Sequence, residues 1–274
     1  MKFTKMHGAG NDFILIDNRD GAVPETEYAA LARSLCRRRL SLGADGLIVV
    51  LPPSRGGDYA MAFYNSDGSL GEMCGNGARC IARYGYEHGL AGETQRIETT
   101  AGMVIGRRVG PELYRVRLND PTVLLPEVTF PEEDGLPPCA YAELGDPGIP
   151  HAVVRLDKWE ETPRAELREL AKMIRFSPVF PRGANVTFWA EVEPNHVKAV
   201  TYERGVEDFT LACGTGAGST AAVLRLMGLA DGEVRLDYPG GTLFVTAEEA
   251  DGKIKDLYLT GPAVTVAEGE VLTY

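Results

Sequence analysis

The sequence EMCGNGARCIARY, residues 72–84, places a cysteine directly before a run of small residues that is typical of a helix start. The sequence LACGTGAGSTAAV, residues 211–223, repeats this arrangement. When Cys74 and Cys213 are aligned, each is followed by Gly-x-Gly-Ala, and Ala82 aligns with Ala221. The two cysteines lie 139 residues apart in a chain of 274. This spacing indicates a duplicated domain with one such cysteine in each half.

Segments upstream of the two cysteines repeat in the same order. GNDFILID (10–17) and GIPHAVVRLD (148–157) each open an alternating apolar segment, 64 and 65 residues before their cysteines. AFYNSDGS and VTYERGVE each end a strand-like run about ten residues before the thiol. Three matches in one order predict an α+β protein of two pseudo-symmetric domains. Each domain is expected to be a mostly antiparallel sheet wrapped around a central helix that begins at the cysteine.

Hydrophobic periodicity supplies the expected elements. Helices are predicted over 25–38, 75–88, 163–174 and 214–227, and Gly89 and Gly228 are placed to end the second and fourth. Strands are predicted at 13–17, 47–51, 59–64, 113–118, 153–156, 186–192, 197–202, 234–236, 243–247 and 257–259.

The expected domain division follows from the repeat. We expect a first domain over 1–120 with Cys74, and a second over 121–262 with Cys213. The sequence NDP (119–121) is the predicted linker. A C-terminal strand over 263–274 is expected to return to the first domain.

The composition restricts the function classes. Apolar residues make up 44% and charged residues 24%, as in a globular protein. The formal net charge of −11 disfavours nucleic acid and anionic membranes as partners. No apolar run approaches the roughly 18 residues of a membrane span, and the N-terminus lacks a signal-peptide core. We therefore expect a cytoplasmic protein with a small-molecule partner.

Cysteine and histidine spacing argues against a bound metal. The five cysteines include no CxxC pair, and the four histidines are scattered, so neither zinc nor a thioredoxin-like site is expected. Reduced thiols are predicted. Cys36, Cys80 and Cys139 are interpreted as small buried hydrophobic residues.

A cysteine at a helix start has a distinctive chemistry. The first turn of a helix has unpaired N–H groups and partial positive charge, which favour a thiolate and can bind a carboxylate. Two such thiols on opposite sides of one carbon could remove a proton from one face and return one to the other. That arrangement predicts inversion of a stereocentre without a cofactor.

Other interpretations of these motifs are weaker. CGTGAGST (213–220) could be a phosphate-binding loop, but no GxxxxGK[ST] motif occurs. HGAGNDF (7–13) lacks the third glycine of a dinucleotide fingerprint and precedes its strand. A thiol-redox or metal-binding protein would need closely spaced cysteines.

The motifs together resemble the diaminopimelate epimerase family. The stretch from Asn65 to Arg79 is similar to the signature of that family, and KMHGAGNDF, GIPH, GANV, YERG, ACGTGA and LTGPA are similar to its other landmarks, in order. The resemblance covers the whole chain. It implies a PLP-independent epimerase that interconverts LL- and meso-diaminopimelate in lysine and cell-wall biosynthesis. It implies no cofactor, an active site in a cleft between the two domains, and is compatible with a homodimer.

The resemblance also implies roles for individual residues. Cys74 and Cys213 would be the acid–base pair. On separate grounds, His151 is a candidate to orient or polarise Cys74, because it lies at the start of the equivalent strand in the second half. The remaining substrate-binding residues would be Gly75, Asn76, Gly214 and Thr215 for the reacting carboxylate, Asn11 and Glu203 for the reacting ammonium, and Asn65, Asn185 and Arg204 for the distal amino-acid end. An arginine beside amides independently suits a second carboxylate.

The chain departs from the family pattern at two positions. Ile149 stands where the family pattern has asparagine, and Gly46 stands where it has glutamine. Each departure removes a polar contact to the distal end of the substrate. A proline- or hydroxyproline-type racemase is the nearest alternative, but a monocarboxylic cyclic substrate would leave Arg204 without a carboxylate.

Overall fold

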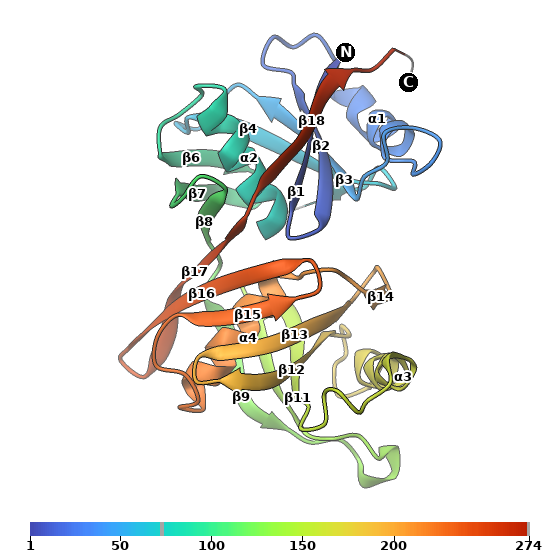
Figure 1. Ribbon diagram of the computed structural model, residues 1–274, viewed down its shortest axis with the longest axis vertical. Helices are drawn as coiled ribbons and strands as arrows, with labels where there is room; N and C mark the ends of the chain where they lie inside the picture. Colours follow the sequence, from blue (N-terminus) through green and yellow to red (C-terminus); the bar gives the residue numbers. More distant parts are fainter. Residues whose placement is uncertain (72–73, 273–274) are drawn as a thin grey trace. The chain divides into compact units, whose positions relative to one another are not determined.

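The computed structural model describes residues 1–71 and 74–272, and the chain forms two compact units (Figure 1). The first unit is Met1–Val116 together with Thr260–Tyr274, and the second is Arg117–Leu259. The domain division expected at 120/121 and 262/263 stays a prediction. The segment predicted as linker lies at the start of the second unit, where Pro121 is the first residue of a strand, a position at which proline removes no needed N–H donor.

The first unit begins with a hairpin of β1 (Lys2–Gly8) and β2 (Asn11–Asp17). β2 is parallel to β3 (Gly46–Leu51), which is antiparallel to β4 (Tyr59–Asn65). β4 is antiparallel to the short β5 (Leu70–Gly71) and parallel to β6 (Thr94–Thr99), and β7 (Gly102–Arg108) and β8 (Leu113–Arg117) continue the sheet. β18 (Val264–Glu270) pairs with β1. Of the strand expected over 263–274, the last two residues lie outside the described part.

The second unit repeats this order of pairings. β9 (Pro121–Val128) and β11 (Ile149–Arg155) flank β10 (Cys139–Leu144), both antiparallel. β11 is parallel to β12 (Asn185–Glu193), which is antiparallel to β13 (His196–Glu203). β13 is antiparallel to the short β14 (Asp208–Phe209) and parallel to β15 (Val234–Tyr238). β16 (Gly241–Ala250) pairs with β15, and β17 (Lys253–Pro262) follows.

The helices occupy equivalent places in the two units. α1 (Tyr28–Leu35) and α3 (Arg164–Arg175) each connect the two parallel strands β2–β3 and β11–β12. α2 (Gly75–Glu87) and α4 (Gly214–Leu226) each follow the short strand and lead into the next parallel one. Short 3-10 turns lie at Glu25–Glu27 and Glu132–Asp134. The predicted fold class, α+β with two pseudo-symmetric halves, is confirmed.

The two central helices are buried because their residues are small. In α2, ten of the thirteen residues are buried, and a methyl group at Gly106 of β7 would come within 3.0 Å of the Ala82 Cβ atom. α4 is likewise buried at ten positions. Gly89 (φ +66°) and Gly228 (φ +69°) follow the two helices in the left-handed conformation, as their predicted role as helix terminators requires. Small residues thus allow each sheet to close around its helix.

Two expectations need correction. The helix predicted over 25–38 is a 3-10 turn followed by α1, which ends at Leu35. Several strands were not predicted: β1, β5, β6, β7, β9, β10 and β14. β9, for example, carries exposed or half-buried side chains throughout, so it has no apolar alternation to recognise. Within the described residues no helix exceeds thirteen residues, and none has the length and hydropathy that a bilayer span requires.

Candidate active site

Cys74 and Cys213 are the N-cap residues of α2 and α4. Both have extended backbone, with φ/ψ of −130°/116° at Cys74 and −119°/114° at Cys213. The first helical hydrogen bonds run from Ala78 N to Cys74 O (2.8 Å) and from Ala217 N to Cys213 O (2.9 Å). The backbone N–H groups before Ala78 in α2 and before Ala217 in α4 therefore have no carbonyl partner inside the helix, as at any helix N-terminus. The two cysteines have the same local structure in equivalent places of the two units.

The Cys74 thiol is half-buried and faces the turn between β1 and β2. Its Sγ atom lies 3.4 Å from Asn11 Oδ1, to which the Asn76 amide also donates at 3.4 Å. Asn11 in turn donates through Nδ2 to Asp45 Oδ2 at 2.6 Å. Gly10, with φ +87°, allows the tight turn that presents Asn11. Asn11 and Asn76 were predicted as site residues, and the structure brings both to Cys74.

Asp45 is a residue that the sequence patterns did not single out. Its carboxylate holds Asn11, and Arg38 donates to its Oδ1 atom at 2.8 Å. Arg38 also pairs with Asp12 at 2.7 Å. Burial alone would raise the pKa of Asp12, but hydrogen bonds from Lys5 and Arg38 lower it below its usual value. Asp12, which shares Arg38 with Asp45, is thus held ionised.

The Cys213 thiol is buried, with 6% of the residue exposed. Gly216 N donates to its Sγ atom at 3.3 Å, and Thr215 Oγ1 lies 3.5 Å away. Burial raises the pKa of Cys213 well above its usual value, and the negative charge of Glu203 adds to this. The expectation that a helix start makes the thiol more readily ionised is therefore wrong for Cys213. Removal from water outweighs the helix N–H groups, so Cys213 is a neutral thiol.

His151 is fully buried beside the start of α4. Its Nε2 atom lies 3.0 Å from Thr215 Oγ1 and 3.4 Å from Asn185 Nδ2. Since the Asn185 amide nitrogen can only donate, Nε2 accepts and the ring proton lies on Nδ1, which has no partner among the described residues. Burial lowers the pKa of His151 to about 3, and Arg204 contributes to this. His151 thus contacts Thr215, next to Cys213, while its predicted action on Cys74 stays a prediction.

The buried neutral His151 makes stability depend on pH. The unfolded chain has an ordinary histidine pKa of 6.5, so between about pH 6.5 and about pH 3 it binds one proton more than the folded state. The wild type should therefore lose stability as the pH falls through this window. His151→Asn should weaken this dependence, by up to roughly 1.4 kcal/mol per pH unit. Urea unfolding at pH 7 and pH 5 measures the free energy of unfolding of the wild type and of each variant, with His196→Asn as the control. If this free energy changed equally between the two pH values in the wild type and in His151→Asn, the prediction would be contradicted.

The residues predicted for the distal end of the substrate lie at strand ends: Asn65 ends β4, Asn185 begins β12 and Arg204 follows β13. Arg204 is held by its backbone N–H, which donates to Asn185 Oδ1 at 2.8 Å, and its Nη1 atom donates to Arg182 O at 3.0 Å. Asn185 also donates to Pro150 O at 3.2 Å. In the first unit, Asn65 donates to Ser69 Oγ at 2.9 Å. Each predicted amide therefore makes loop contacts, and Asn185 ties the Arg204 loop to β11.

Glu203, the other predicted charged residue, ends β13. Its Oε1 atom accepts a hydrogen bond from Thr210 Oγ1 at 2.5 Å, across the β13–β14 pair. Its charge acts on the Cys213 thiol. The structure thus brings Glu203, Thr215 and Cys213 to one end of the second unit.

The departure at Gly46 has a packing reason. Gly46 is the first residue of β3 and pairs with Asn65 of β4. A Cβ atom at this position would lie 2.5 Å from the Phe63 ring and 2.8 Å from the Tyr64 carbonyl oxygen. Phe63 therefore occupies the space that a longer side chain would need. Ile149, the other departure, begins β11 and is half-buried.

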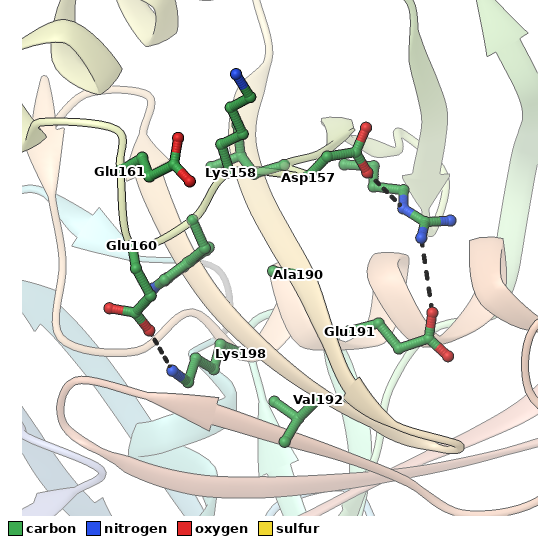
Figure 2. Close-up of a pocket in the computed structure, with 11 residues that line it drawn as sticks. Asp157, Lys158, Glu160, Glu161, Ala190, Glu191, Val192 and Lys198 are labelled. Atoms are coloured by element: carbon green, nitrogen blue, oxygen red, sulfur yellow. Dashed lines mark hydrogen bonds and ion pairs between the residues drawn. The ribbon is translucent and has the colours of Figure 1, made fainter.

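The pockets found in the described residues are not lined by the predicted site residues. The pocket in Figure 2, of about 400 Å³, lies in the second unit beside β12 and β13. Five of its charged side chains form ion pairs: Arg155 with Asp157 (3.1 Å) and Glu191 (3.6 Å), and Lys198 with Glu160 (2.5 Å). A second pocket, of about 1300 Å³, lies beside β1, β2 and β18. Chemistry is therefore expected at the two cysteines rather than in these pockets.

Solved structures share this fold at low identity. A phenazine biosynthesis protein of the PhzF family from Bacillus anthracis is 19% identical, with a TM-score of 0.69 over 100% of this chain and 99% of that one. A probable proline racemase from Agrobacterium radiobacter K84 is 18% identical (TM-score 0.68; 98% and 92% covered), and a hydroxyproline epimerase from Agrobacterium vitis is 16% identical (0.69; 98% and 91%). The chain therefore has the same fold as these proteins.

Sequence comparison identifies the family. The model of the diaminopimelate epimerase family matches residues 3–110 and 145–266. Diaminopimelate epimerases from Archaeoglobus fulgidus (38% identical; 97% of this chain and 95% of the relative) and Aquifex aeolicus (37% identical; 100% of both) are similar over nearly their whole length. The chain belongs to the diaminopimelate epimerase family and is an isomerase. The resemblance seen in the motifs is confirmed.

Proposed function

We propose that the protein interconverts LL- and meso-diaminopimelate by proton transfer between Cα and two thiols, in lysine and cell-wall biosynthesis. The observation that carries this proposal is the matched pair of N-cap cysteines on the central helices of two pseudo-symmetric units. Its relatives are diaminopimelate epimerases. We propose a cytoplasmic enzyme that acts on this small molecule and not on nucleic acid or a membrane surface.

The proposed reaction balances without an external reagent. The thiolate of one cysteine removes the proton from Cα, and its sulfur becomes a thiol. The electron pair remains on Cα and delocalises into the adjacent carboxylate. The thiol of the other cysteine then delivers its proton to the opposite face and becomes a thiolate. The configuration is inverted and the protonation states of the two cysteines are exchanged.

The helix starts stabilise the charge that develops in this reaction. We propose that the α-carboxylate accepts hydrogen bonds from the backbone N–H groups of Gly75, Asn76, Gly214 and Thr215. These groups precede the first internal hydrogen bonds of α2 and α4 and carry the partial positive charge of the helix ends. Because the backbone is already in place, its stabilisation costs no reorganisation when the proton moves.

The remaining contacts would select an amino acid with a second amino-acid end. Glu203 and the Asn11 amide oxygen suit the reacting ammonium. Arg204, with Asn65 and Asn185, suits the distal carboxylate and ammonium. A proline-type substrate has only one carboxylate, so Arg204 favours diaminopimelate.

We predict that the purified enzyme incorporates deuterium from solvent at Cα of LL-diaminopimelate while forming the meso isomer, without added PLP and with EDTA present. The thiols are sufficient acid–base groups, and the described residues include no cluster of three His, Cys, Asp or Glu side chains placed to hold a metal. Proton NMR in deuterium oxide measures the exchange, with L-proline as the control substrate. Exchange of proline but not diaminopimelate, or loss of activity on chelation with recovery on zinc, would overturn the proposal.

A further inference from the structure

Arg79, in the second turn of α2, is a fully buried arginine without a carboxylate partner in the part of the chain that the structure describes. Its exposed fraction is 0%, and it is the largest completely buried side chain in the described part of the chain. No carboxylate among residues 1–71 and 74–272 forms an ion pair with it. A buried charge without a counter-ion is strongly unfavourable, so such a side chain needs a specific reason to be retained.

The guanidinium points back toward the start of α2, as helical side chains do. Its Nη2 atom donates to Asn76 Oδ1 at 2.7 Å, and its Nη1 atom to Gly75 O at 3.3 Å. Its Nε atom donates to Pro262 O at 3.3 Å. Arg79 thus contacts the two residues that directly follow Cys74. Because it is fully buried, it cannot itself contact a substrate.

The neighbouring strand leaves no room for another arrangement. Gly8, at the end of β1, passes directly over Arg79 and Asn76. A methyl group at Gly8 would lie 2.9 Å from Asn76 O and 3.3 Å from Arg79 Nη2. The guanidinium is therefore enclosed between α2, β1 and the chain at Pro262.

The anions that act on Arg79 are thiolates. Burial lowers the pKa of Arg79 to about 10. The negative charges of Cys80 and Cys74, when these thiols are ionised, act in the opposite direction and raise the pKa of Arg79. Burial raises the pKa of Cys80 to about 12, so Cys80 remains a neutral thiol at neutral pH. Arg79 remains protonated there. The Cys74 thiolate is then its available counter-charge among the described residues.

The other charged groups near α2 have partners of their own. Arg83 pairs with Glu87 at 2.7 Å and with Glu112 at 3.3 Å. In the loop before β3, Asp45 accepts hydrogen bonds from Asn11 Nδ2 and Asp12 N and pairs with Arg38. Further groups on the strands packed on the helix are His7 of β1, Glu98 of β6, Arg108 of β7 and Glu268 of β18, which contact Gly10, Arg55, Glu93 and His88, respectively.

The second unit lacks an equivalent cation. The position that corresponds to Arg79, five residues after the cysteine, is Gly218, where a methyl group would lie 2.6 Å from Leu118 Cδ1. Cys213 instead has the carboxylate of Glu203 near it. Among the described residues, a buried cation thus acts at the helix start of Cys74 and a carboxylate acts at Cys213.

We propose that Arg79 is a positioning residue for Cys74: its buried guanidinium fixes Asn76 at the helix start and is the counter-charge of the Cys74 thiolate. Of the two cysteines, Cys74 is then the one that ionises more readily, and it gives up the hydrogen bond from its thiol to Asn11 Oδ1 when it does so. The proposal rests on the proposed function only in taking these two cysteines as the proton-transferring pair.

The test is the pH dependence of alkylation, measured separately for each cysteine. The full-length enzyme is treated with iodoacetamide between pH 5.5 and 10, and peptide mass mapping gives the alkylation rate at Cys74 and at Cys213. The midpoint pH, unlike the rate itself, does not depend on how accessible each thiol is. In the wild type the midpoint for Cys74 should lie below that for Cys213. Arg79→Met should raise the Cys74 midpoint by about 1 pH unit or more and leave that of Cys213 unchanged.

Two further variants separate charge from packing. Arg79→Lys keeps the positive charge but loses the planar guanidinium that donates to Asn76 Oδ1 and Gly75 O. In this variant the midpoint pH for alkylation of Cys74 should stay near that of the wild type. Arg83→Met removes an already paired cation from the same helix and should leave the midpoint unchanged. A lower midpoint for Cys213 than for Cys74 in the wild type, which needs no variant to fold, would overturn the proposal. So would a folded Arg79→Met whose Cys74 midpoint equals that of the wild type. Because alkylation does not require turnover, failure of the proposed epimerase activity would be seen separately.

Discussion

Cys74→Ala and Cys213→Ala are each expected to lower kcat for epimerisation by about 10³- to 10⁴-fold. Inversion needs a base on one face of Cα and an acid on the other, and general acid–base catalysis of this kind contributes about 10²- to 10⁴-fold per group. Each variant loses one of the two groups. The measurement is the conversion of LL- to meso-diaminopimelate, followed by chromatographic separation of the isomers.

The two substitutions should be strongly non-additive. Since the thiols act as a unit, the double variant should be little worse than either single one. Each single variant keeps one thiol, so it should still exchange the Cα proton of the isomer that presents that proton to it, without inversion. If Cys213→Ala kept most of its epimerase activity, the two-thiol mechanism would be wrong.

Cys139→Ala is the matched control. Cys139 is buried in the apolar core of the second unit, and burial raises its pKa to about 12. It therefore behaves as a small hydrophobic side chain, and its replacement should leave kcat within about twofold of the wild type while lowering stability slightly. A large loss of activity in this variant would show that the cysteine effects are not specific to the N-cap positions.

The fold was predictable where runs of small residues or alternating apolar residues were clear in the sequence. The two Cys-Gly-x-Gly-Ala helix starts and the strands β3, β4, β12 and β13 could be read from small-residue runs and apolar alternation. β1 could not, because its pairing depends on residues about 260 positions apart in the sequence. In β9 the side chains are exposed or half-buried, so local periodicity carries no information about the strand.

The candidate site was less predictable than the fold, because ionisation depends on burial. Cys213 and Cys74 have the same local sequence, yet the surroundings of Cys213 oppose ionisation through burial and Glu203. Arg79 looks like a solvent-facing residue of an amphipathic helix, and only the packing of Gly8 over it shows that it is enclosed. Asp45 is likewise recognisable only once β2 and the loop before β3 lie side by side.

Arg204→Met is expected to raise KM for diaminopimelate by roughly 10²- to 10³-fold, with kcat within about tenfold of the wild type. Truncating one partner of a hydrogen-bonded charge pair costs about 2–5 kcal/mol, and each 1.4 kcal/mol is a factor of ten. The distal carboxylate lies away from the reacting carbon, so its contact strengthens substrate and transition state alike, which affects KM more than kcat. The backbone of Arg204 is held by Asn185 and should keep its place in the variant.

Steady-state kinetics with diaminopimelate and with a monocarboxylic amino acid would test the Arg204 prediction. Arg168→Met is the control, because Arg168 pairs at the surface of α3 with Asp208 at 2.8 Å and should leave KM unchanged. Only diaminopimelate has a distal carboxylate, so the substitution should reduce kcat/KM for it alone. A reduction by the same factor for both substrates would mean that Arg204 does not face the distal end. The charge of Arg204 would then act on His151 of β11, which contacts Thr215 of α4 and whose protonation Arg204 already disfavours.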